Sequence, residues 1–209
     1  MKITIKNMVS ELFPDVWPVI FIITVIVCSL RIAYLIKNHQ KFCFYRELFM
    51  LLFILYIMCL FEEVTAQDNN YGLSNFIPFK EIFRYKIGSR LFIRNIIGNI
   101  LLFLPYGYFA SDLLKSKKLG SIWLLTAIVS LTIELVQLNI GRTFDIDDII
   151  LNTIGGVLGF YLYRVIEKIK GSLPKFFTTD GFMNFIVILI LIIVILYLTD
   201  WHVVTWING

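Results

Sequence analysis

The sequence predicts an all-α integral membrane protein in which about six transmembrane helices form one bundle. Of its 209 residues, 58% are hydrophobic and only 16% are charged, and the mean hydropathy is +0.81. A soluble domain of this size cannot bury so much apolar surface. The charged residues also gather in short clusters between long runs of Ile, Leu, Phe and Val, which lipid solvates in a membrane protein.

Six apolar stretches predict the spans, at about residues 18–36, 48–60, 94–114, 121–138, 149–166 and 182–199. The first follows Lys2 and Lys6, as in a signal peptide, but no small-x-small cleavage site follows it, so we expect it to remain as a helix. The second is short and is expected to draw on residues 42–45. We divide the chain into an N-terminal helix with a basic inner loop (1–47), a central membrane domain (48–163) and a C-terminal part (164–209). That last part holds a basic linker, the sixth helix and an aromatic tail.

Charge, cysteine usage and missing motifs exclude several classes of function. The excess of 19 Lys and Arg over 15 Asp and Glu is small and scattered, so no nucleic-acid partner is expected. Cys28, Cys43 and Cys59 do not have the spacing of metal ligands, and neither a disulfide nor a zinc site is expected. His39 and His202 lie far apart, and the sequence contains no H-E-x-x-H, G-x-S-x-G or P-loop motif.

Basic residues in the loops predict the orientation, because Lys and Arg near span ends are retained on the cytoplasmic side. Ten fall in the loops expected inside and eight in the segments expected outside, and the three short basic loops share one side. Both termini are therefore predicted outside. The long 62–94 loop between the second and third spans and the 141–148 loop are predicted to face outside with them.

Polar side chains that lipid disfavours gather at the outer ends of the third, fourth and fifth spans, which predicts a polar pocket there. In the third span, Asn95 and Asn99 are four residues apart and share a helix face, with Arg94 at its mouth. Pro105 is expected to break or kink this helix deeper in the membrane.

The fourth span carries the most costly of these residues. Ser130, Glu134 and Gln137 share one face, with Glu134 about one turn below the outer end. An unpartnered carboxylate at this depth is expensive, so we expect Arg142 to neutralise either Glu134 or Asp148.

One arc of the fifth helix carries polar side chains at its outer end and glycines further into the membrane. At about 100° per residue, this arc contains Asp145, Asp148, Asn152, Gly156 and Gly159. Gly155 and Gly159 form a G-x-x-x-G pair, which favours close approach of a neighbouring helix. Asp147 points away from the arc, so we rank it below Asp145 and Asp148 and expect at most that it caps the helix.

These residues are the candidates for chemistry. The candidate catalytic residues are Glu134, Asp148 and Asp145, and the candidate ligand-binding residues are Arg142, Arg94, Asn95, Asn99, Gln137 and Asn152. The carboxylates with an Asn could hold Mg²⁺ while Arg142 and Arg94 bind phosphate, or Glu134 could act as a general base. The sequence requires no cofactor. The structural alternatives stay open: a charge network that merely joins helix ends, and amides that merely bond across helices.

Several of these segments together carry a resemblance to a known family. They are Asn75-Phe-Ile-Pro78-Phe79, Asn95-x-x-x-Asn99-Ile-Leu-Leu-Phe-Leu-Pro-Tyr-Gly107, Glu134-Leu-Val-Gln137 and Arg142-x-x-Asp145-x-x-Asp148-x-x-x-Asn152-Thr-x-Gly155. In their combined order and spacing they resemble the VanZ-like family of membrane proteins, over about residues 48–163. The resemblance implies a multi-pass protein of the bacterial cell membrane. The family's namesake is associated with resistance to the lipoglycopeptide teicoplanin, whereas no general reaction follows from the resemblance.

Three functions from different classes are compatible with these observations. The favoured one is a non-catalytic resistance protein whose outside pocket binds an envelope lipid headgroup or a lipid-linked cell-wall precursor and so limits what the antibiotic reaches. The second is a membrane enzyme, a hydrolase or transferase, that acts on a lipid-linked phosphate with the same residues. The third is a small transporter or flippase, for which inverted repeats are missing from the sequence. The predicted partner is a membrane lipid or a lipid-linked cell-wall precursor, and the oligomeric state is left open.

Overall fold

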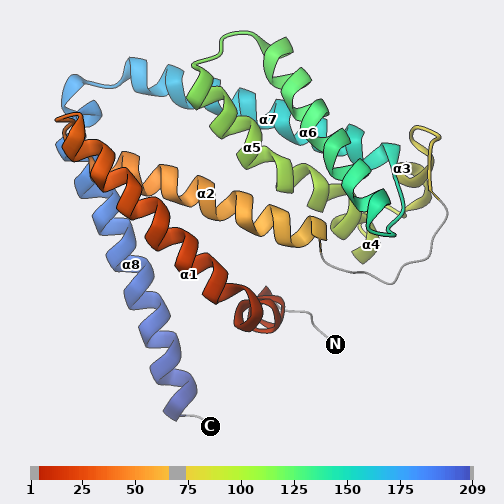
Figure 1. The fold of residues 1–209 in the computed structure, drawn as a ribbon, viewed down its shortest axis with the longest axis horizontal. Coiled ribbons are helices and arrows are strands. Elements are labelled where there is room, and N and C mark those ends of the chain that lie inside the picture. The colour runs from red at the N-terminus through yellow and green to blue at the C-terminus, as the bar shows by residue number, and fades with distance from the viewer. Residues whose placement is uncertain (1–4, 66–73, 208–209) are drawn as a thin grey trace. The chain divides into compact units, whose positions relative to one another are not determined.

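The computed structural model is built from helices, as the sequence predicts (Figure 1). It describes the backbone of residues 5–65 and 74–207, and the side chains of 18–62 and 74–194. The elements are α1 (Ile5–Lys37), α2 (Phe44–Thr65), α3 (Lys80–Arg84), α4 (Arg90–Phe92), the π-helix η1 (Ile93–Ile97), α5 (Gly98–Leu114), α6 (Leu119–Asn139), α7 (Ile146–Ser172), the 3-10 helix η2 (Lys175–Thr178) and α8 (Asp180–Ile207). Within the described residues, extended pairing is limited to one bridge between Asn75 and Asp145.

Within the part of the chain that the structure describes, five helices are long and apolar enough to cross a membrane. They contain the candidate spans Pro18–Lys37, Phe44–Glu62, Arg90–Leu114, Leu119–Asn139 and Ile146–Ser172. The second span includes Phe44 and Tyr45, as expected from its short apolar core. The sixth predicted span falls in α8, of which the apolar part with described side chains, Asp180–Val194, is shorter than a full span. The total of six spans and the orientation therefore stay predictions.

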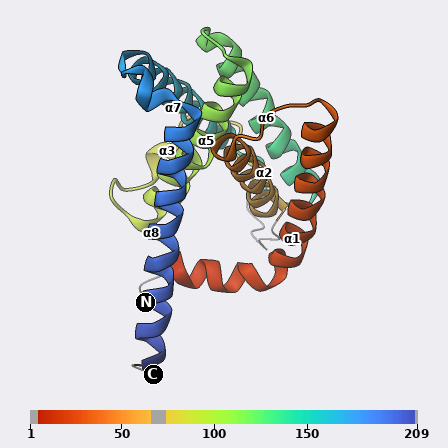
Figure 2. The same cartoon turned by 90° about the vertical axis from the view of Figure 1, so that its left-hand side faces the viewer.

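The chain divides into two compact units, one formed by residues 1–55 with 172–209 and the other by residues 56–171. In the first unit, the Arg31 guanidinium pairs with the Glu47 carboxylate at 2.7 Å, and the N–H of Tyr45 donates to Oδ1 of Asn184 at 2.9 Å. Arg46 also pairs with Asp180 at 2.9 Å, so α8 is tied to the start of α2. α1 bends along its length (Figure 2).

The second unit is a bundle of α5, α6 and α7 in which glycines let the helices approach closely. A Cβ atom on Gly155 would lie 2.2 Å from the carbonyl oxygen of Ile100, and one on Gly159 would lie 2.2 Å from that of Leu104. The predicted G-x-x-x-G pair therefore faces α5. A Cβ atom on Gly156 would lie 2.3 Å from Oγ1 of Thr126, so α7 is also pressed against α6.

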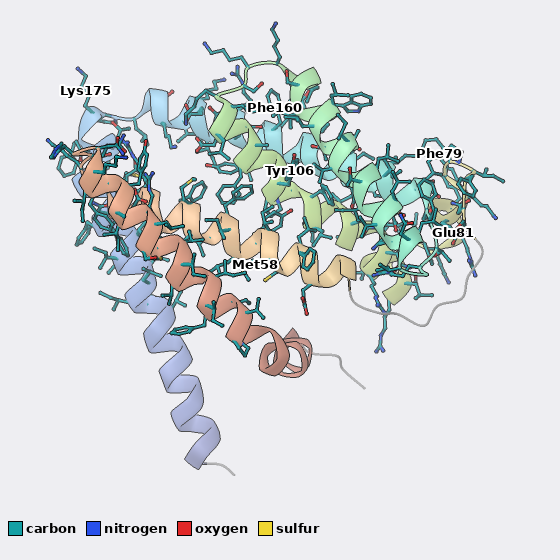
Figure 3. All side chains as sticks on the ribbon, viewed as in Figure 1. Met58, Phe79, Glu81, Tyr106, Phe160 and Lys175 are labelled. Carbon is teal, nitrogen blue, oxygen red and sulfur yellow. The ribbon has the colours of Figure 1, made fainter. Side chains whose placement is uncertain are left out.

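Aromatic and aliphatic side chains fill the space between these three helices. Ile122 is fully buried and packs with Ala110 and Phe160. Tyr106 is partly buried and packs against the same cluster; Figure 3 labels Tyr106 and Phe160. These contacts join residues of α5, α6 and α7, so the polar end of the bundle is held by an apolar core below it.

Pro105 does not break its helix, because α5 continues through it from Gly98 to Leu114; a kink at this residue stays a prediction. The irregularity lies instead at η1, where the backbone takes the wider π form just before Gly98. Single turns of π-helix are rare and occur often at functional sites. This one carries Arg94 and Asn95 and leads directly to Asn99.

The glycine contacts predict a sharp difference between two positions of α7. Gly159→Ala should destabilise the bundle by about 1–3 kcal/mol, because its Cβ would overlap the backbone of α5. Gly171→Ala is the matched control: it lies in the same helix with open space around it, and should leave stability unchanged or slightly raised. Thermal unfolding of the purified variants in detergent measures both. Equal melting temperatures for the two variants would contradict the close packing.

Candidate polar site at one end of the bundle

Two loops that are far apart in the sequence meet at the end of the bundle. The N–H of Asn75 donates to the carbonyl of Phe144 at 2.8 Å, and the N–H of Ile146 donates to the carbonyl of Asn75 at 3.0 Å. The rings of Phe76 and Phe144 stack with centroids 5.1 Å apart. The long loop and the 141–148 loop therefore lie at the same end, as expected; which side of the membrane that end faces is a prediction.

Asp145 joins this loop contact to α6 and α7. Its Oδ1 accepts hydrogen bonds from Nδ2 of Asn75 and from the N–H of Asp147, both at 2.9 Å, so Asp145 caps the start of α7. Its own N–H donates to Oε2 of Glu134 at 2.9 Å. Burial raises the pKa of Asp145, and the hydrogen bonds from Asn75 and Asp147 oppose that rise.

Asp147 has a different task from the one expected. It is only 1% exposed and does not cap its own helix, which Asp145 does. Its Oδ1 accepts from the N–H of Phe79, and its Oδ2 accepts from the N–H groups of Glu81 at 2.7 Å and Ile82 at 3.2 Å. Asp147 therefore caps α3 and holds Phe79 in a left-handed conformation with φ of 68°. The side chain of Asp147 points away from the arc, as the helical periodicity predicts, and holds α3 to the start of α7.

The polar residues inside the bundle form two layers. In the outer layer, Nδ2 of Asn99 on α5 donates to Oδ1 of Asp148 on α7. Four residues deeper on α7, Nδ2 of Asn152 donates to Oγ of Ser130 on α6 at 2.9 Å. Since Ser130 also lies four residues from Glu134, this amide–hydroxyl pair lies about one turn below the carboxylates.

The inner layer leaves one acceptor without a donor. Asn152 is 4% exposed, and its Oδ1 is the buried side-chain atom in the described part of the chain that has no hydrogen-bond partner. Glu134 beside it is 2% exposed, and Arg142 lies close enough for its charge to act on that carboxylate. The site as a whole is rich in acceptors, and an additional donor would complete it.

The remaining predicted residues lie around this cluster. Asn95 and Gln137 are half-buried and Arg94 is exposed, so these three lie nearer its edge. Asn75 and Ser130 complete the hydrogen-bond network although they were not among the candidate site residues. Asn75 had a signal, because it opens the Asn-Phe-Ile-Pro-Phe segment of the resemblance, and Ser130 shared the helix face of Glu134.

The described residues do not bring together a set of carboxylates arranged as Mg²⁺ ligands. Across the residues that the structure describes, no three Asp, Glu, His or Cys side chains come together as metal ligands would. The carboxylates of Glu134, Asp145 and Asp148 instead accept N–H groups of the protein.

Comparisons with known proteins identify the family of this chain. The model of the VanZ/LLP1 family matches residues 44–167. The chain belongs to this family. It is also 33% identical over 114 residues to Protein VanZ of Enterococcus faecium, an alignment that covers 53% of this chain and 66% of that relative, just under two thirds of its length. No solved structure matches the chain.

The VanZ/LLP1 match contains the whole polar cluster. Asn75, Asn99, Glu134, Asp148 and Asn152 all fall inside residues 44–167, whereas α1 and α8 fall outside. The family thus corresponds to the part of the chain that builds and holds the site.

The network predicts that Asp147 is more costly to change than an ordinary acidic residue. Asp147→Ala should lower the free energy of unfolding by about 2 kcal/mol or more, because it leaves three N–H groups at the start of α3 without their acceptor. Asp147→Asn should also destabilise, since an amide replaces one acceptor oxygen with a donor.

Asp112→Asn is the matched control, because it removes a single pair with Lys115 at the turn between α5 and α6 and should cost less than about 1 kcal/mol. Thermal unfolding and limited proteolysis within residues 76–92 would measure the effects. An Asp147→Ala protein that melts like the control and resists proteolysis would show that the cap does not hold this loop.

Proposed function

We propose that this VanZ-family protein binds the polar headgroup of an envelope lipid or lipid-linked cell-wall precursor, and thereby lowers susceptibility to lipoglycopeptide antibiotics such as teicoplanin. The observation that carries the proposal is the unpaired Oδ1 of Asn152 beneath three carboxylates. A buried acceptor without a donor costs free energy in a membrane-spanning bundle. A ligand that brings donors would recover that cost.

The chemistry of such headgroups fits the site. Cell-wall precursors present hydroxyl, amide and ammonium groups, all of which donate hydrogen bonds, and a carboxylate is the strongest acceptor for them. Arg142 lies in the 141–148 loop, which also holds Asp145. Its guanidinium group is suited to a phosphate of the same ligand, because a guanidinium can donate two parallel hydrogen bonds to phosphate oxygens.

The hydrogen bonds that the carboxylates already accept favour ligand binding over catalytic turnover. Glu134 accepts the N–H of Asp145, Asp145 accepts Asn75 and the N–H of Asp147, and Asp148 accepts Asn99. Groups held this way are preorganised acceptors, whereas a general base must also reach a substrate proton. Capture of the headgroup is enough to limit what a lipoglycopeptide reaches.

The direct test is to neutralise the two carboxylates that lie within α6 and α7. Glu134→Gln and Asp148→Asn keep the side-chain shape but remove the charge, and removing a charged partner should weaken headgroup binding by about tenfold or more. Teicoplanin susceptibility of a heterologous Gram-positive host expressing each variant is the readout. We expect protection to be lost in both variants while the protein is still made and folded.

The control is again Asp112→Asn, an equally conservative change at the opposite end of the bundle, and it should keep full protection. Expression level and melting temperature are measured for every variant, so that loss of protection is separated from loss of protein. Wild-type protection in both Glu134→Gln and Asp148→Asn at normal expression would show that the cluster is purely structural.

A further inference from the structure

The segment of residues 76–94 is fixed to the bundle but directs apolar side chains outward. Asp147 caps α3 within it, and the N–H of Phe92 donates to Oγ of Ser89 at 3.1 Å at the start of α4. Phe79 and Glu81 mark this end of the bundle in Figure 3. Because its backbone is held at these points, the segment cannot simply turn its side chains inward.

Several large apolar side chains of this segment are highly exposed. Phe83 is 83% exposed and Ile87 is 85% exposed. Phe76, Ile77 and Leu91 are each more than half exposed as well. Five large apolar side chains exposed within 16 residues are typical of a segment that binds protein or membrane.

The same segment is strongly basic. Its five basic residues, all exposed, are Lys80, Arg84, Lys86, Arg90 and Arg94. Its one acidic residue, Glu81, pairs with Arg84 at 3.0 Å. Basic side chains interleaved with exposed apolar ones are typical of segments that lie in the interface of a bilayer.

We propose that residues 76–94 form a docking surface for anionic phospholipid headgroups, with Lys and Arg on the phosphates and the apolar side chains among the upper acyl chains. The segment runs directly into the candidate span that begins at Arg90, which places its end at the boundary of the apolar region. A second copy of the chain is a poor occupant, because it would bring five more basic residues against these five. The proposal does not rest on ligand binding by the polar cluster.

The test places a photoreactive residue, benzoylphenylalanine, at position 87 of the full-length protein. The protein is reconstituted into vesicles with equal amounts of phosphatidylglycerol and phosphatidylcholine, irradiated, and analysed by mass spectrometry. We expect lipid adducts in which phosphatidylglycerol exceeds phosphatidylcholine by about fivefold, the preference that a single surface Lys or Arg gives for an anionic headgroup.

Charge variants of the same labelled protein complete the test. Lys80→Gln with Lys86→Gln should reduce the phosphatidylglycerol preference by about half or more, because two of the five basic side chains are neutralised. Lys117→Gln with Lys118→Gln, two exposed lysines in the turn between α5 and α6, should leave it unchanged.

Three results would overturn the proposal: no adduct, a cross-link to a second copy or another protein, or lipid adducts without phosphatidylglycerol preference. These results are independent of teicoplanin susceptibility, so failure here and failure of the proposed function are distinguishable.

Discussion

The acidic run at the start of α7 is the interaction on which the polar end of the central unit depends. Asp145, Asp147 and Asp148 are separated by one or two positions, and each helical step turns the side chain by about 100°, so they point in different directions. Asp145 holds its own helix and the loop at Asn75, Asp147 holds α3, and Asp148 holds α5 through Asn99. One turn of helix thus connects three segments. Carboxylates suit this task because each can accept several N–H groups, and burial strengthens these bonds.

The close packing below this turn brings the polar residues of three helices to within hydrogen-bond distance. Without Cβ atoms on Gly155 and Gly159, the backbone of α7 contacts α5 directly, and Gly156 admits Thr126 of α6. Short side chains such as Ser130 can then reach across to a neighbouring helix. The small residues and the polar cluster are therefore parts of one arrangement, and the unsatisfied Oδ1 of Asn152 lies within it, three residues before Gly155.

Helical periodicity predicted much of this from the sequence, because it fixes which residues of one helix share a face. It gave the Asp148–Asn152 arc and the close approach at Gly155 and Gly159, while the length of the apolar stretches gave the five spans that the described residues contain. Periodicity could not show that N–H groups of a loop more than 60 residues away donate to Asp147, since that depends on tertiary contacts. Nor did it predict that η1 takes the π form, because no residue pattern marks such a turn. Pro105 was expected to break or kink its helix, and α5 continues through it without a break.

Whether the acceptor-rich cluster holds the donors of a lipid headgroup can be measured by identifying the lipids that co-purify with the protein. The protein is purified in mild detergent from Gram-positive membranes, and the lipids that accompany it are determined by mass spectrometry against the lipids of the same membranes. We expect a polyprenyl-linked cell-wall precursor or another donor-rich envelope lipid to be enriched. Recovery of bulk phospholipids alone, in the proportions of the surrounding membrane, would contradict it.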